Sequence, residues 1–150
     1  MRCPPEQDRL YIQMKKLALA KMEDGELATT ASVLTQIMRL QQICCGHLQP
    51  DEGPIRPIKS NRLPALMEVV EEVQGKAIIW ATYTHDIMAI QKELARVYGE
   101  ESVACYYGAT PQDERQEIVN RFQNPSDPLR FFVGQPKTGG YGITLTEANT

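Results

Sequence analysis

Apolar residues recur at helical spacing in the first third of the chain. One apolar stripe predicts a helix over residues 5–22, ended near Gly25, and a second predicts a helix over residues 26–45, ended by Gly46. Residues 48–60 contain three prolines and a glycine without any period. Such a stretch is typical of a connecting loop, so two helices precede everything that alternates.

Beyond residue 60, short apolar runs alternate with helical patterns. The runs at residues 76–81, 102–107 and 129–134 are too short for helices and are typical of strands covered on both faces. Because parallel neighbours need a crossover, the order helix, strand, helix, strand, helix, strand predicts a parallel sheet with helices on its faces. Helix ends are expected at Gly75 and Gly99, and helix caps at Ser60, Thr84 and Thr110.

Composition narrows the class of protein. The chain has 150 residues, of which 42% are hydrophobic and 23% are charged, as in ordinary soluble domains. It lacks both the roughly 18 consecutive apolar residues of a membrane span and an apolar secretory signal at its start, so we expect an intracellular protein. The net charge of −3 argues against nucleic-acid binding through bulk electrostatics, so any phosphate contact must be local.

The segment KTGGYGITLTEANT, residues 137–150, offers a lysine, hydroxyls and closely spaced glycines just past an expected strand. Such a loop can approach a phosphodiester without reading a base, because glycine lets backbone amides come close to an anion. The alternative is that the glycines merely permit a tight turn. Since the sequence has no phosphate-binding P-loop and no acidic pair after a strand, we expect no ATP hydrolysis by the chain alone.

Other candidate groups have ordinary explanations. Cys44, Cys45 and His47, with Cys3, suggest zinc, but they lack the paired spacing of structural zinc sites, so we expect no metal and reduced thiols. His85 fits a helix start better than a catalytic role.

Several motifs in order resemble one known family. LQQICCGHL (40–48), KSNRL (59–63), KAIIWATYTHDI (76–87), YYGAT with RFQ downstream, and FFVGQPKTGGYGITLTEANT (131–150) resemble the second RecA-like lobe of Swi/Snf-type ATPases, a branch of the superfamily 2 helicases. Short loops make small prokaryotic and phage members the most similar in character. The resemblance implies a three-layer α/β/α lobe with a mainly parallel sheet, incomplete at its end, over residues 61–150. It also implies a helical lead-in or interlobe brace over 1–47 and a linker over 48–60.

The resemblance also implies roles for particular residues. The fourth motif, the "hG" turn with its following helix, and the first part of the fifth motif face nucleic acid in this family. On this chain they correspond to Thr82, Tyr83, Gly108, Arg115, Gln135, Lys137, Thr138 and Gly139. The later part of the fifth motif faces the nucleotide, and corresponds here to Gly140, Gly142 and Thr144.

The chain departs from the family pattern at several of these positions. Gln135 and Pro136 stand where serine and threonine are usual, and Thr144 stands where asparagine or aspartate is usual. Lys137 keeps the charge of the usual arginine without its bidentate fork. Arg115 is expected to have either a structural or a DNA-facing role.

The resemblance places a P-loop lobe before Met1 and an arginine-bearing motif after Thr150. ATP and Mg²⁺ are therefore expected in the complete enzyme, with none bound to these residues alone. The implied partners are double-stranded DNA and the N-terminal RecA-like lobe, without a membrane; the location would be cytoplasmic in a prokaryote or phage and nuclear in a eukaryote. Two alternatives remain open, namely a stand-alone RecA-like module that binds nucleic acid or protein without catalysis, and a generic nucleotide- or phosphate-binding α/β domain.

Overall fold

The computed structural model describes residues 4–23, 30–49, 53–139 and 143–148. The chain forms two compact units, Met1–Pro64 and Ala65–Thr150, which are considered one at a time. Among the described residues, no helix combines the length and apolar character that crossing a membrane requires.

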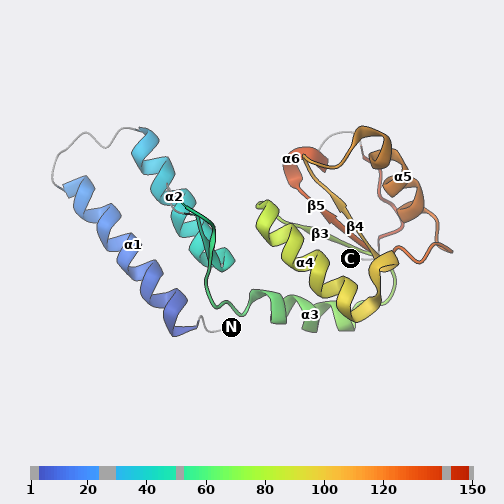
Figure 1. Ribbon diagram of the computed structural model, residues 1–150, viewed down its shortest axis with the longest axis horizontal. Coiled ribbons are helices and arrows are strands. Elements are labelled where there is room, and N and C mark those ends of the chain that lie inside the picture. Colours follow the sequence, from blue (N-terminus) through green and yellow to red (C-terminus); the bar gives the residue numbers. More distant parts are fainter. Residues whose placement is uncertain (1–3, 24–29, 50–52, 140–142, 149–150) are drawn as a thin grey trace. The chain divides into compact units, whose positions relative to one another are not determined.

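The first unit is built on two helices that lie side by side, α1 (Pro5–Glu23) and α2 (Thr30–Cys45) (Figure 1). The buried Gln7 side chain links them, because its Nε2 donates to the carbonyls of Ile43 at 2.8 Å and Cys44 at 3.0 Å. These carbonyls belong to the last turn of α2, where helix carbonyls have no intrahelical partner. Both predicted helices are confirmed, although the predicted start of the second, residues 26–29, lies outside the described residues.

The predicted loop over residues 48–60 is partly wrong. It contributes to a small antiparallel ladder between β1 (His47–Leu48) and β2 (Arg56–Pro57), extended by an Ile58 amide that donates to the Gly46 carbonyl at 2.8 Å. Strands of two residues are too short to show an alternating pattern, so the prolines alone led to the prediction of a loop. Gly46 has φ +85°, as expected for the residue that ends a helix.

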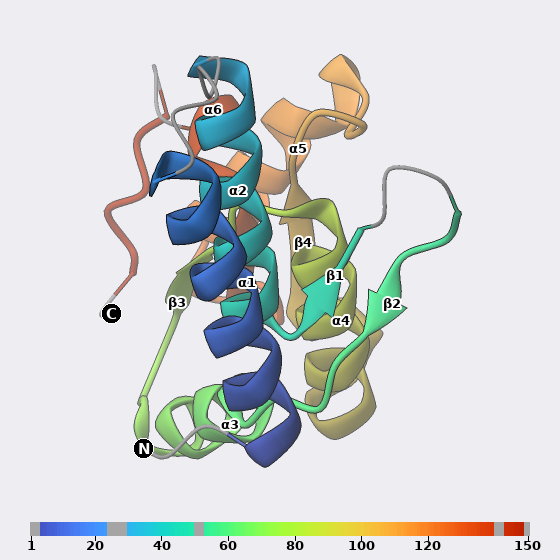
Figure 2. The same ribbon diagram turned by 90° about the vertical axis from the view of Figure 1, so that its left-hand side faces the viewer.

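The second unit holds a three-stranded parallel sheet in the order β3-β5-β4 (Figures 1 and 2). Its elements are α3 (Arg62–Glu72), which begins just before the unit boundary, β3 (Ala77–Trp80), α4 (Thr84–Tyr98), the 3-10 turn η1 (Glu100–Ser102), β4 (Val103–Tyr106), α5 (Gln112–Gln123), β5 (Phe131–Gly134) and α6 (Pro136–Gly139). All three predicted strands and the helices between them are confirmed. Gly75 and Gly99 follow α3 and α4 with φ +98° and +94°.

The sheet is covered on both faces, as an α/β/α lobe requires. One face packs Ala77, Val103, Phe131 and Val133 against α3 and α4, whereas the other packs Phe132 and Tyr106 against Phe122 of α5 and against residues 143–148. The connection from β3 to β4 crosses the sheet past β5, and the connection from β4 to β5 returns in the opposite direction. Right-handed crossovers in opposite directions place their helices on opposite faces, which explains the positions of α4 and α5 (Figure 1).

Two of the three predicted caps are wrong. Tyr83, not Thr84, is the residue before α4, because its carbonyl accepts the first helical hydrogen bonds, from the Asp86 and Ile87 amides. Its backbone is extended and its side chain makes no cap, so Thr84 already lies inside the helix. Pro111 precedes α5, and the Thr110 hydroxyl is used elsewhere: it donates to the Cys105 carbonyl at 3.0 Å and accepts from the Tyr107 amide at 3.1 Å. The Ser60 hydroxyl does accept an amide at the start of a helix, from Arg62 at 3.2 Å.

Candidate nucleic-acid interface at the carboxyl edge of the sheet

The three strands of the second unit end at the same level. Trp80 and Tyr106 are both register partners of Gly134, the last residue of the central strand. The residues that follow therefore gather along one edge of the sheet, the edge at which open α/β sheets bind ligands. Thr82, Gly108 and Gln135, each predicted to face nucleic acid, lie there within two residues of a strand end.

Gln135 ties this edge together. Its amide nitrogen donates to the Tyr106 carbonyl of β4, and its side-chain Nε2 donates to the Thr82 carbonyl after β3, both at 2.9 Å. Its own carbonyl accepts the amides of Thr138 and Gly139, which closes the turn of α6. Gln135 thus joins three segments, two through its backbone and the Thr82 segment through its side chain, so the departure from the usual serine has a structural use.

Arg115 braces the turn after β4 from within α5. Its Nε donates to the Thr110 carbonyl at 3.0 Å, and a terminal nitrogen lies 3.3 Å and 3.4 Å from the carbonyls of Tyr107 and Gly108. The guanidinium also lies 5.6 Å from the centre of the Tyr106 ring. This arrangement leaves Gly108 exposed at the tip of a held turn.

The short helix α6 carries the remaining predicted contacts. Lys137 is exposed, Thr138 is half-buried, and Gly139 is buried. Thr138 Oγ1 lies 3.4 Å from Gln135 Oε1, so the threonine is oriented by the same glutamine. Across the edge, Thr82 is exposed and Tyr83 is half-buried. The described part of this edge therefore offers an exposed cation, Lys137, beside hydroxyl groups and an exposed glycine backbone.

Trp80 is the residue at this edge that the sequence analysis did not assign. It ends β3, keeps 47% of its surface exposed, and packs edge-on against the buried Phe132 ring at a centroid distance of 6.2 Å. Its indole fills the space above Gly134 and beside Gly139. The sequence feature that could have indicated this contact is a single tryptophan at the end of one expected strand, together with glycines at and after the end of another.

Of the three residues predicted to face the nucleotide, the structure describes only one. Gly140 and Gly142 lie outside the described residues, whereas Thr144 is exposed on the segment that follows. Gln123 at the end of α5 anchors this segment: its Oε1 accepts the amides of Thr146 and Glu147 at 3.0 Å and 3.1 Å, and its Nε2 donates to Thr146 Oγ1 at 3.1 Å.

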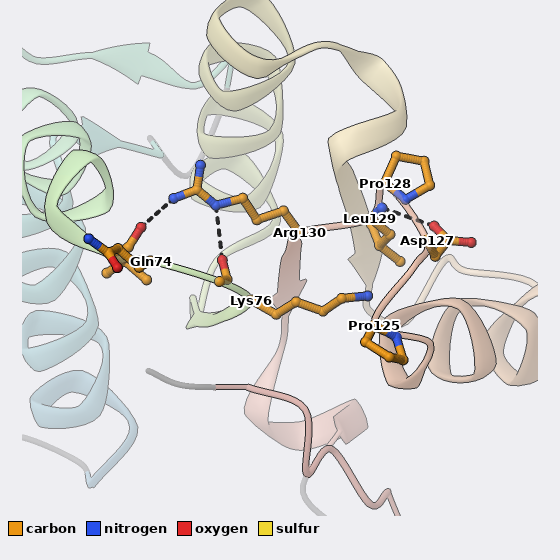
Figure 3. A pocket seen from close by; sticks show the side chains of 9 residues that line it. Gln74, Lys76, Pro125, Asp127, Pro128, Leu129 and Arg130 are labelled. Carbon is orange, nitrogen blue, oxygen red and sulfur yellow. Dashed lines mark hydrogen bonds between the residues drawn. The ribbon is translucent and has the colours of Figure 1, made fainter.

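The opposite edge of the sheet holds a groove whose charged groups are committed to structure (Figure 3). Lys76 Nζ donates to the carbonyls of Asn124 at 2.6 Å and Arg121 at 3.2 Å, and Arg130 donates to those of Gly75 and Val73. Desolvation lowers the pKa of Lys76. These cations satisfy carbonyls at and beyond helix ends, so the groove shows no convergent reactive group.

Nucleophilic and metal chemistry find no support in the described part of the chain. No three His, Cys, Asp or Glu side chains gather there as a metal would need, and Cys3 of the suggested zinc set lies outside it. Burial raises the pKa of Cys105 to about 11, which keeps it a thiol at neutral pH.

Comparison with known proteins agrees with the geometry. The model of the family "Helicase conserved C-terminal domain" matches residues 59–150. The chain is 25% identical over 96% of its length to the chromatin structure-remodeling complex subunit snf21 of Schizosaccharomyces pombe, and 27% identical over 96% to the nuclear protein STH1/NPS1 of Saccharomyces cerevisiae. It spans only 13% and 12% of those two proteins.

Two solved structures from Sulfolobus solfataricus are similar. The SWI2/SNF2 ATPase C-terminal domain matches 97% of this chain with 26% identity and a TM-score of 0.74, and the chain covers 64% of that structure. The SWI2/SNF2 ATPase core domain matches the same share with 26% identity and a TM-score of 0.69, and the chain covers 31% of it.

Proposed function

Because the chain belongs to the helicase conserved C-terminal domain family, as the C-terminal lobe of a Swi/Snf-type helicase-like ATPase, we propose that its carboxyl sheet edge grips the backbone of double-stranded DNA. The observation that carries the proposal is the level ending of the three strands, which gathers Thr82, Gly108 and the α6 turn along one edge. The proposed contacts are Thr82, Tyr83, Gly108, Lys137, Thr138 and Gly139, with Gln135 and Arg115 holding them in place.

The charge of this unit sets the strength of the grip. Residues 65–150 contain seven lysines and arginines against twelve aspartates and glutamates, a net charge of −5. Attraction to DNA must therefore come from local contacts, and the affinity of this lobe alone should be weak. Contacts to backbone carry no sequence information directly, so binding should not depend on base sequence.

The lobe should also contribute half of an ATP site shared with a P-loop-bearing lobe. The described residues fit a partial site only: Thr144 presents an exposed hydroxyl on a segment held by Gln123, and no phosphate-binding loop occurs in the sequence. Bound ATP with Mg²⁺ would supply the free energy of hydrolysis for lobe movement. The task of this chain is to orient Thr144 and to keep the DNA-contacting edge rigid while the lobes close and reopen.

The first unit and the origin of the protein also belong to the proposal. We assign the helical lead-in over residues 1–47 the role of a brace between lobes, followed by a linker over 48–60 and the lobe itself over 61–150. A prokaryotic or phage source, with a cytoplasmic location, stays a prediction; the two relatives compared above are yeast proteins, whereas the two structures come from an archaeon.

The test is the salt dependence of binding to a short DNA duplex of mixed sequence, measured by fluorescence anisotropy. Lys137→Ala should weaken binding and lower the slope of log K against log salt by about 1, the loss of one phosphate contact. Lys92→Ala, which removes an exposed cation on α4, is the matched control and should leave that slope unchanged. Equal effects of the two variants would refute the assigned edge, and binding independent of salt would refute the function.

A further inference from the structure

Trp80 is the only tryptophan of the chain and lies within the proposed interface, at the end of the outer strand β3. It ends β3 level with Gly134, and the first residue of α6 follows Gly134 by two positions. The residue is 47% exposed, although its ring contacts two buried glycines. Neither the resemblance nor the comparisons assign a role to this residue.

The glycines mark how closely the indole approaches. A Cβ placed on Gly134 would lie 2.6 Å from Cζ3 of Trp80, and a Cβ on Gly139 would lie 2.8 Å from both Cη2 and Cζ3. Neither glycine is among those with positive φ, so space and not backbone conformation requires glycine there. The six-membered part of the indole therefore occupies the volume that side chains at 134 and 139 would take.

The indole is itself held from behind. Phe132, which is fully buried, lies edge-on to Trp80 and packs against the rings of Tyr106 at 5.4 Å and Phe122 at 5.6 Å between centroids. This aromatic cluster reaches from the sheet to α5, so the ring of Trp80 rests on a rigid support. A rigid ring can set the distance between α6 and the end of β3.

We propose that Trp80 is a positioning residue that fixes the α6 turn, and with it Lys137 and Thr138, at the height needed to contact the DNA backbone. The inference rests on the proposed function, since it names the device that orders the same site. Gln135 joins α6 to the Thr82 carbonyl at 2.9 Å, and Trp80 keeps the two segments apart by its volume. One interaction pulls the turn toward β3 and the other limits its approach.

A double-mutant cycle tests the steric part. Gly139→Ala should weaken binding to the DNA duplex on the order of tenfold, because its methyl group and the indole cannot occupy the same space. Trp80→Ala should weaken binding too, since the turn loses its support. In W80A, however, the methyl of G139A has room, with Ile143 Cδ1 at an ordinary 3.6 Å, so G139A should weaken binding several-fold less in W80A than it does beside the intact indole. Trp80→Phe should retain more affinity than W80A because it restores an aromatic ring.

A spectroscopic arm separates this inference from the proposed function. Since Trp80 is the sole tryptophan, its emission in G139A should shift to the red as the ring is displaced toward water, with or without DNA. Additive effects of the two substitutions, or unchanged emission and affinity in G139A, would overturn the inference while leaving the Lys137 result standing. Binding of the unmodified chain to DNA that does not depend on salt would instead overturn the proposed function. Circular dichroism of each variant confirms that the comparison is made on folded chains.

Discussion

Replacing Arg115 distinguishes a brace from a phosphate ligand. In the structure its guanidinium makes one good backbone hydrogen bond, from Nε to the Thr110 carbonyl at 3.0 Å, and longer ones to Tyr107 and Gly108 at 3.3 Å and 3.4 Å. A charged donor contributes about 1.5 kcal/mol to such a bond, and the longer bonds together with the contact to the Tyr106 ring add about 0.5 kcal/mol. Arg115→Ala should therefore lower the free energy of unfolding by about 2 kcal/mol.

The assay is thermal unfolding followed by circular dichroism. For a unit of this size, 2 kcal/mol corresponds to a fall in Tm of about 10 °C. Arg115→Lys is the decisive variant, because lysine keeps the charge but cannot reach several carbonyls from one planar group. If Arg115 braces the turn, R115K should lose most of the stability that R115A loses. Wild-type stability of R115K together with a DNA-binding defect in R115A alone would refute the reasoning.

Three further predictions concern other parts of the chain. The Leu129 amide and the Arg121 guanidinium lower the pKa of Asp127. The ionised carboxylate therefore stabilises the fold above its unfolded pKa, and this contribution is lost as the pH falls. In chemical unfolding between about pH 5 and pH 3, the stability of Asp127→Asn should therefore fall less than that of the wild type. Gln123→Ala should speed hydrogen exchange at the Thr146 and Glu147 amides, measured by NMR, whereas the exposed Gln116→Ala should not; equal protection in both variants would contradict the anchor. Limited proteolysis should spare α1 and α2 if they act as a brace, and early cleavage within them would count against that role.

The sheet and its helices could be predicted because their apolar residues keep one period over many positions. Residues 76–81, 102–107 and 129–134 each read as buried runs, and the structure places β3, β4 and β5 within them. Periodicity needs length, however, so the two-residue strands β1 and β2 were missed.

The caps failed for a different reason. A threonine just before a helical pattern satisfies the local rule for a cap. The Thr110 hydroxyl, however, already bonds the Cys105 carbonyl and the Tyr107 amide in the segment before the helix. Which bond a hydroxyl makes depends on the whole turn and not on the residue type.

The site shows the same limit. Motif order located the edge residues, yet the use of Gln135 as a tie, of Arg115 as a brace and of Trp80 as a spacer depends on contacts between segments far apart in the chain. These roles follow from the packing of α5 and α6 around the strand ends, which a one-dimensional pattern does not contain.

The central claim is that this lobe grips DNA within an ATP-driven motor. Its most direct test is the rate of ATP hydrolysis, with and without double-stranded DNA, by a protein that joins this chain both to a lobe with a phosphate-binding loop and to the arginine-bearing motif that the resemblance implies. DNA should raise the rate, and Lys137→Ala should reduce that stimulation while leaving the rate without DNA unchanged. The same rate with and without DNA would contradict the account.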